Sequence, residues 1–406
     1  MILVLSVINI LLAVIGVYRS YIKKSMVILP WIIIFYFSIT SAMVCLSTGW
    51  REYGVKSVNV YLWNWFACTM AFLVADFLFN KKERKKVDLQ SLFSWNLAIP
   101  IEVIFWLTFI VTAVILRNQD YTTYVRGGGA YFWQNMFQFA SFIVFYFVLK
   151  KQWIKVSVAF LIMIAIIVFT PVRSLLFFIV MPIFVYVIYQ YMYSAKDFKF
   201  FFARFIPLSI LGLFVAGVLS SIRFGLIRLP ETELTDISLD VINYYNSGES
   251  LPLFYLNSWQ HFFDGLMAPV YNGLRMFGID ISPDLAPSIP LVNASINGGQ
   301  SDSLYVGELG HNPATLMHDF LLSFGSFAFV EAFVYYFFLL KLCNFIQKNK
   351  MSLMLFSTVF GWHIYMVMRG ALDNACSGIG YSIWYVAIFY FLVEYVGLFG
   401  KNGETL

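Results

Sequence analysis

The chain has 406 residues, of which 60% are hydrophobic, 20% aromatic and only 12% charged, with a mean hydropathy of +0.77. A soluble domain carries about twice that share of charge, so the composition excludes an ordinary soluble protein. The net charge of +5 is thinly spread and gives no reason to expect a nucleic-acid partner. The four cysteines form no CxxC pair and no metal-ligand spacing, so we expect no structural disulfide, no bound metal and no cofactor.

Apolar stretches long enough to cross a bilayer recur along the chain and predict an all-α polytopic integral membrane protein with about 11 transmembrane helices. We expect helices one to eight in residues 1–222, one large periplasmic loop with short amphipathic helices in 223–314, and helices nine to eleven with a short cytoplasmic tail in 315–406. The first span lacks the flanks of a cleavable signal peptide, so we expect a retained helix. The expected spans are 2–18, 26–47, 58–79, 96–116, 130–149, 156–171, 174–194, 205–222, 315–340, 351–368 and 379–399.

Lysine and arginine are unequally divided between the two sets of connecting loops. The loops after spans one, three, five, seven and nine, with the C-terminus, hold 15 lysines and three arginines, including KKERKK at 81–86. The opposite set holds eight arginines and one lysine, although it includes the 92-residue segment 223–314. By the positive-inside rule the first set is cytoplasmic. The N-terminus and the long loop are therefore expected outside, and the C-terminus in the cytoplasm.

The outer loops use arginine in place of lysine. Insertion needs only positive charge, whereas a guanidinium offers a planar fork of donors that matches phosphate or carboxylate. We therefore expect these arginines to bind an anion; the alternative is that they snorkel or pair with loop carboxylates. Arg173 is the best candidate, because in FTPVRSLLFF it follows a helix-breaking proline and starts an apolar span. Arg126 lies beside three glycines, which form an anion-binding nest or only a flexible turn. Arg223, in LSSIRFGLIRLP, could instead cap a helix. The remaining candidates are Arg275 and Arg369.

Two histidines lie where the long loop meets span nine, in GELGHNPATLMHDFLLSFG at 307–325. Pro313 suits the first turn of a helix and Asn312 its N-cap, which places His311 just before the helix, and His318 with Asp319 inside it. Either imidazole is a candidate general base near neutral pH; the alternative is a hydrogen-bonded interfacial histidine.

The long loop and the membrane spans hold further polar candidates. Trp259 and Tyr255 combine a flat apolar face with polar neighbours and are candidates for contact with sugar, although packing on the membrane surface explains them equally well. Acids inside expected spans are costly and call for a role. Asp76 and Glu394 lie near cytoplasmic ends, so we expect water to solvate them at little cost in free energy. For Glu102 and Glu331 we expect internal pairs or hydrogen bonds.

The whole plan resembles the bacterial O-antigen polymerase (Wzy) family, which is related to the O-antigen ligases. TPVRSLLFF resembles the arginine-led span before the family's long loop, SSIRFGLIR resembles its loop-entry arginine, and GHNPATLMHDFLLSFG resembles its loop-exit motif. The spacing departs at Thr315, where the family pattern has leucine; counting from His318 instead places Leu322 correctly, so the histidine that corresponds stays open. The resemblance implies a GT-C-like helical fold.

The resemblance further implies glycosyl transfer on the periplasmic side of the bacterial inner membrane. The substrate would be an undecaprenyl-pyrophosphate-linked oligosaccharide repeat unit, and a chain-length regulator and a flippase of the same pathway are candidate partners besides the bilayer. On this interpretation the arginines bind pyrophosphate, His311 or His318 is catalytic, and Trp259, Tyr255 and Asp319 contact glycan. The alternatives are a lipid-linked oligosaccharide flippase or transporter and an O-antigen ligase.

Overall fold

The computed structural model describes residues 1–49, 52–86, 96–97, 99–117, 143–169, 174–195, 197–204, 315–347 and 399–400, together with isolated positions between 207 and 274. These residues are helical apart from turns and one antiparallel pair of two-residue strands, β1 (Asn96–Leu97) and β2 (Phe399–Gly400). The expected spans at 205–222, 351–368 and 379–399 fall almost wholly outside these ranges, as do most of 130–149 and most of the long loop. The chain divides into two compact units.

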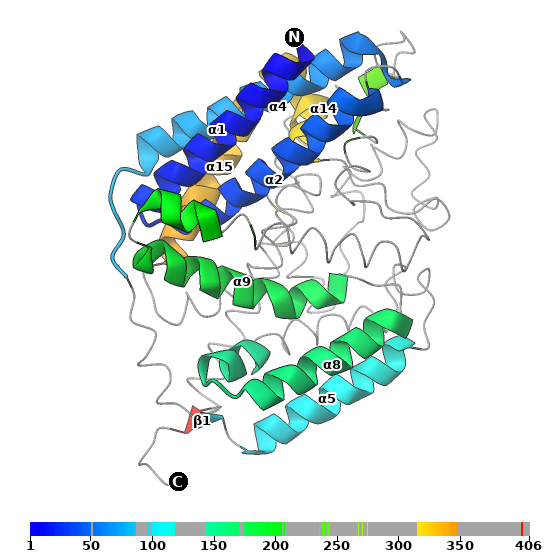
Figure 1. The fold of residues 1–406 in the computed structure, drawn as a ribbon, viewed down its shortest axis with the longest axis vertical. Coiled ribbons are helices and arrows are strands. Elements are labelled where there is room, and N and C mark those ends of the chain that lie inside the picture. The colour runs from blue at the N-terminus through cyan, green and yellow to red at the C-terminus, as the bar shows by residue number, and fades with distance from the viewer. Residues whose placement is uncertain are drawn as a thin grey trace. The chain divides into compact units, whose positions relative to one another are not determined.

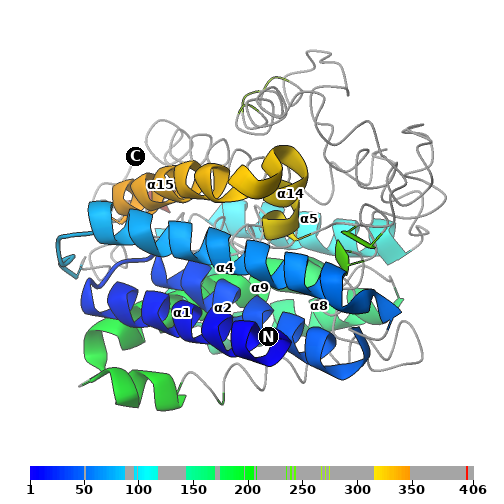
Figure 2. The same cartoon turned by 90° about the horizontal axis from the view of Figure 1, so that it is seen from above.

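The described part of the first unit contains five main helices. They are α1 (Ile2–Ile22), α2 (Ile28–Val44, continued by the π-helical turn Cys45–Gly49), α4 (Gly54–Phe79), α14 (Leu316–Phe324) and α15 (Ala328–Ile346). Figures 1 and 2 show α4 lying between α1 on one side and α14 with α15 on the other. Contacts at successive levels show that α1, α4 and the α14–α15 segment run in the same direction: Asn9 to Leu62, Arg19 to Asp76, Asn64 to Met317, and Phe79 to Phe337.

Within the described residues, four segments are long and apolar enough to cross a membrane: Ile2–Ile22, Ile28–Ser47, Gly54–Phe79 and Gly325–Phe345. The first three match the expected spans 2–18, 26–47 and 58–79. They leave large apolar side chains such as Leu3, Leu11 and Val74 on the surface, where a bilayer would cover them. The described part is therefore compatible with an all-α membrane protein, as the sequence predicts, whereas the total of eleven spans and the outer loop remain predictions.

The prediction of one continuous helix at 315–340 is wrong. Helix α14 ends at Gly325, which adopts φ 57° and ψ −124°, and a short 3-10 turn (Gly325–Phe327) precedes α15. Glycine reaches a positive φ without the steric cost that a Cβ imposes, so it ends the helix here. The spanning segment begins at Gly325, and α14 is a separate helix of nine residues, too short to cross a bilayer.

Close packing between α1 and α2 depends on Gly16. A Cβ added at Gly16 would overlap the six-membered ring of Trp31. Trp31 is fully buried, and its indole ring packs against the rings of Phe72 and Tyr336. One indole from α2 thus reaches α1, α4 and α15, and it forms the centre of the core of this unit.

The second unit contains α5 (Ile99–Arg117), α8 (Trp153–Phe169) and most of α9 (Ser174–Ser194). Helices α5 and α8 lie side by side (Figure 1). Glu102 near the start of α5 forms an ion pair with Lys155 of α8, and it also accepts a hydrogen bond of 3.4 Å from Trp106 Nε1. The prediction that Glu102 forms an ion pair or a hydrogen bond is confirmed, although the pair is partly exposed.

Candidate functional site

Three of the loops that the sequence assigns to the cytoplasm meet at one end of the first unit. The hydroxyl of Tyr193 lies 3.3 Å from the carbonyl oxygen of Lys24, 3.3 Å from that of Arg84 and 3.1 Å from that of Lys85. Tyr21 donates to the carbonyl of Ala195 over 3.1 Å. The loops after spans one, three and seven are therefore joined by hydrogen bonds, as loops on one side of a membrane would be.

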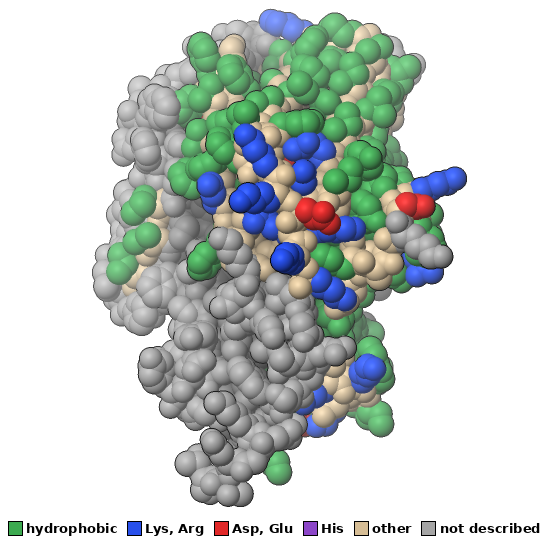
Figure 3. Space-filling view, turned by 90° about the vertical axis from the view of Figure 1, so that its left-hand side faces the viewer, with side chains coloured by type: hydrophobic (Ala, Val, Ile, Leu, Met, Phe, Trp, Pro, Cys, Tyr) green, Lys and Arg blue, Asp and Glu red, His purple; other side chains and the backbone are tan. Residues whose placement is uncertain are grey.

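The positive side chains of these loops gather on one surface, here called the basic face (Figure 3). Two acids accompany it, Glu83 and Asp197. Partial burial lowers the pKa of Lys24, although Glu83 opposes this shift. The members of the basic face are Lys23, Lys24, Lys81, Lys82, Arg84, Lys85, Lys199 and Arg204.

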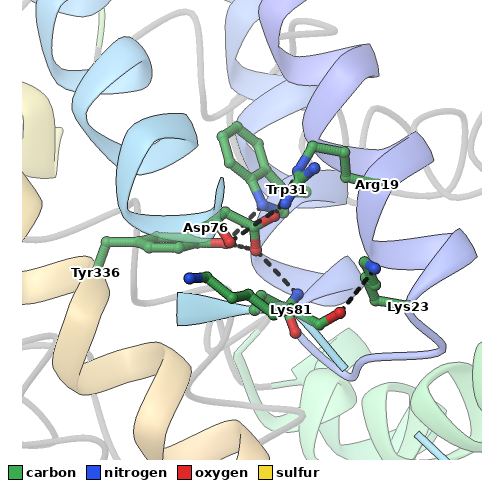
Figure 4. Close-up of polar contacts among 7 residues, drawn as sticks. Arg19, Lys23, Trp31, Asp76, Lys81 and Tyr336 are labelled. Atoms are coloured by element: carbon green, nitrogen blue, oxygen red, sulfur yellow. Dashed lines mark hydrogen bonds and ion pairs between the residues drawn. The ribbon is translucent and has the colours of Figure 1, made fainter. Parts of the chain in front are cut away.

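Asp76, just inside the basic face, is not solvated as the sequence suggested, because its side chain has no exposed surface. Its carboxylate forms an ion pair of 2.9 Å with Arg19 Nε, and accepts hydrogen bonds from Asn80 Nδ2 at 3.0 Å and the Tyr336 hydroxyl at 3.2 Å. The Tyr336 oxygen accepts from Trp31 Nε1 over 2.7 Å. Figure 4 shows these side chains converging from α1, α2, α4 and α15. This network of hydrogen bonds and one ion pair, centred on Asp76, links the four helices.

The opposite end of the unit is organised around α14. Thr315 is its N-cap, with Oγ1 accepting from the backbone amide of His318 at 3.3 Å. Asn64 of α4 donates through Nδ2 to the carbonyl of Met317. These two contacts hold the first turn of α14 against α4. They bury His318 and Asp319, which are 0% and 1% exposed.

Glu331, one turn into α15, completes a buried polar group with His318 and Asp319, here called the buried acid site. Glu331 is 2% exposed. Its carboxyl group and that of Asp319 lie within electrostatic range of each other, and Cys68 of α4 is also within range of Glu331. Burial lowers the pKa of His318 to about 4, against the opposing charge of Asp319. His318 is therefore neutral at physiological pH.

Hydroxyl groups connect this end of the unit to the start of the long loop. Ser41 Oγ of α2 lies 2.9 Å from the Tyr61 hydroxyl and 3.2 Å from Thr235 Oγ1. Ser57 donates to Asn243 Oδ1 over 3.3 Å. Thr235 and Asn243, which belong to segment 223–314, therefore lie against α2 and α4. The sequence does not predict a role for these residues, because single serines and threonines in apolar helices carry no distinctive pattern.

The structure brings together two of the predicted site residues, His318 and Asp319, and adds Glu331 to them. The other predicted residues lie outside the described ranges, and their roles remain predictions. No group of three or more His, Cys, Asp and Glu side chains suited to a metal occurs in the part of the chain that is described. The residues that lie outside are His311, Arg126, Arg173, Arg223, Arg275, Arg369, Tyr255 and Trp259.

Comparison of the chain with models of protein families, with curated proteins and with solved structures finds no match. The function is therefore inferred from the sequence and from the contacts of the described residues.

Proposed function

We propose that the protein is a glycosyltransferase of the bacterial inner membrane that polymerises oligosaccharide repeat units carried on undecaprenyl pyrophosphate. The growing chain would be transferred to an incoming lipid-linked unit on the periplasmic side. The N-terminus would be periplasmic and the C-terminus cytoplasmic. The reaction joins a hydroxyl of the acceptor unit to the anomeric carbon of the donor chain and releases the donor's carrier pyrophosphate.

The observation that supports this proposal best is the chemical contrast between the two ends of the first unit. One end carries the basic face, which suits the cytoplasmic side. The other end carries the buried acid site and contacts the start of segment 223–314. A reaction between two lipid-anchored substrates needs polar groups at the outer membrane boundary and a segment that aligns the substrates there.

The proposed chemistry assigns a separate task to each group of residues. As the bond between the anomeric carbon and the pyrophosphate oxygen breaks, negative charge develops on the leaving group, and Arg173, Arg223, Arg126, Arg275 and Arg369 would stabilise it. A histidine would take the proton of the attacking hydroxyl. The long loop and Asp319 would contact the glycan, with Trp259 and Tyr255 covering apolar sugar faces.

His311 is the better candidate for the base. His318 has no exposed surface, and its lowered pKa makes the imidazole a weak proton acceptor. His311 precedes α14, and in the sequence it carries the Asn312 neighbour of the resembled motif. We therefore assign proton removal to His311 and a positioning role at the end of the loop to His318.

A deletion strain tests the proposal in the bacterium that encodes the chain. Loss of a polymerase leaves a single repeat unit on the acceptor of the surface polysaccharide, and the ladder of longer chains disappears. A complete absence of units from the acceptor, with lipid-linked polymer intact, would instead identify a ligase. Retention of lipid-linked units on the cytoplasmic side would identify a flippase. Either of these two outcomes would refute the polymerase proposal.

One observation favours the flippase or transporter as the second candidate. The α14–α15 segment is interrupted at Gly325 and carries buried acids on both sides of the break. Interrupted helices with ionisable groups near the break are common at substrate and ion sites of transporters. Against this candidate, the chain shows no internal repeat, and a transporter does not need a loop of 92 residues.

A further inference from the structure

Glu331 differs from the other acids described in the apolar helices. Asp76 is paired with Arg19 and Glu102 with Lys155. Glu331 is nine-tenths or more buried, and neither carboxyl oxygen has a hydrogen-bond partner in the described part of the molecule. An ionised carboxylate without donors in an apolar interior costs many kcal/mol, so such a group takes up a proton instead.

The groups that face Glu331 oppose a negative charge there. Asp319 on α14 supplies a second carboxyl group within electrostatic range, and the thiol of Cys68 faces it from α4. Two carboxyl groups in one poorly solvated site do not both ionise readily, because the first charge disfavours the second. A charge on Asp319 therefore disfavours a charge on Glu331.

His318 provides an independent observation that this is a binding site. Both ring nitrogens are buried, and neither has a hydrogen-bond partner among the residues that the structure describes. The Asp319 charge acts on this ring. A neutral imidazole always has one nitrogen able to accept a proton. The site therefore contains Glu331, which has no hydrogen-bond donor in the described part, a second acid, Asp319, and the imidazole of His318, which has no hydrogen-bond partner there.

A metal ion is a poor occupant for this site. Hard cations take six or more oxygen ligands, and even a structural zinc ion takes four ligands. No metal-binding group of three or more such side chains is found in the described ranges. A proton needs only one oxygen atom, and it removes the charge that burial opposes.

We propose that Glu331 is a buried proton-binding site that carries a proton at neutral pH, near the second acid Asp319. The Thr315 cap and the Asn64 contact hold α14, and the Gly325 break sets α14 against α15. The site is thus held by contacts on both helices. This inference does not depend on the glycosyltransferase proposal.

Infrared spectroscopy of the purified full-length protein tests the proposal. The spectrum at neutral pH should contain the carbonyl band of a neutral carboxylic acid. Glu331→Gln should remove this band and keep Tm within about 2 °C of the parent, because glutamine has the shape of the neutral acid. The matched control is Glu102→Gln, which removes an ion-paired carboxylate and should leave the band unchanged. A band that persists in Glu331→Gln would overturn the proposal, and so would a Glu331→Gln protein that fails to fold.

A second variant tests the effect of the Asp319 charge on Glu331. Asp319→Asn removes the neighbouring charge, so Glu331 should ionise more readily, and the acid band should disappear at a lower pH than in the parent. An unchanged pH for loss of the band would show that the two groups are not coupled. A rise in Tm with sodium chloride that is lost in Glu331→Gln, together with no acid band in the parent, would identify a sodium site and contradict the proton site.

Discussion

The Asp76 carboxylate illustrates what a buried ion pair contributes in this protein. Asp76 has no exposed surface, and Arg19 is 17% exposed, with its guanidinium carbon 3.4 Å from the centre of the Phe77 ring. Replacing both partners of such a pair by apolar or neutral groups is often tolerated, whereas removing one partner leaves a buried charge and costs about 3–5 kcal/mol.

We predict that Arg19→Met lowers the free energy of unfolding strongly, because Asp76 keeps only its neutral donors Asn80 and Tyr336. The double variant Arg19→Met/Asp76→Asn should recover most of the loss. The control is Lys155→Met, which breaks a pair in which Lys155 is 36% and Glu102 24% exposed, and which should cost about 1 kcal/mol or less. Thermal unfolding in detergent measures all three. Equal losses in Arg19→Met and Lys155→Met would contradict the structural role of the network.

The titration of His318 predicts a dependence of stability on pH. Its pKa is about 4 in the folded protein and about 6.5 when unfolded, so the unfolded state binds more protons between these values. The histidine thus contributes stability above about pH 6.5, and this contribution is lost as pH falls towards 4. We predict that Tm of the parent falls across this window more steeply than Tm of His318→Gln. Parallel curves would show that His318 is not buried in the neutral form.

At the scale of the helix, the contact between α1 and α2 allows a direct test. Gly16→Ala places a methyl group into the ring of Trp31, and overpacking of this kind costs about 1–3 kcal/mol. We predict a Tm several degrees lower than that of the parent. Leu11→Ala on the same helix, where the side chain is 54% exposed, is the control and should change Tm little in detergent. A Gly16→Ala protein as stable as this control would show that α1 and α2 do not pack closely at Gly16.

The sequence predicted the helices better than it predicted the site. Runs of apolar residues place α1, α2 and α4 within a few residues of their ends, because a bilayer requires a minimum helix length. The sequence pattern does not predict the helix break at Gly325, because apolar residues continue through it and a single glycine does not indicate a positive φ. For Glu331 the sequence predicted an internal pair or a hydrogen bond, but neither carboxyl oxygen has a hydrogen-bond partner in the described part of the chain. Its position near Asp319 depends on that break, which the sequence pattern does not show.

At the scale of the whole molecule, the account requires a fixed orientation. The basic face joins the loops after spans one, three and seven, and we predict that this surface is cytoplasmic and that segment 223–314 is periplasmic. Alkaline phosphatase fused at Ser250 and β-galactosidase fused at Arg84 should both be active. The reciprocal fusions are the control and should both be inactive. Activity of β-galactosidase at Ser250 would place the long segment inside and remove the basis of the proposed function.

Reconstitution of the purified protein tests whether this chain joins lipid-linked repeat units. Purified protein in proteoliposomes, supplied with undecaprenyl-pyrophosphate-linked units, should produce a ladder of longer glycans and release undecaprenyl pyrophosphate. Arg173→Lys should abolish most of this activity, since lysine keeps the charge but lacks the bidentate fork, while Arg51→Lys should retain it. A parent protein that is folded and correctly inserted, yet produces no chain longer than the supplied unit, would contradict the account.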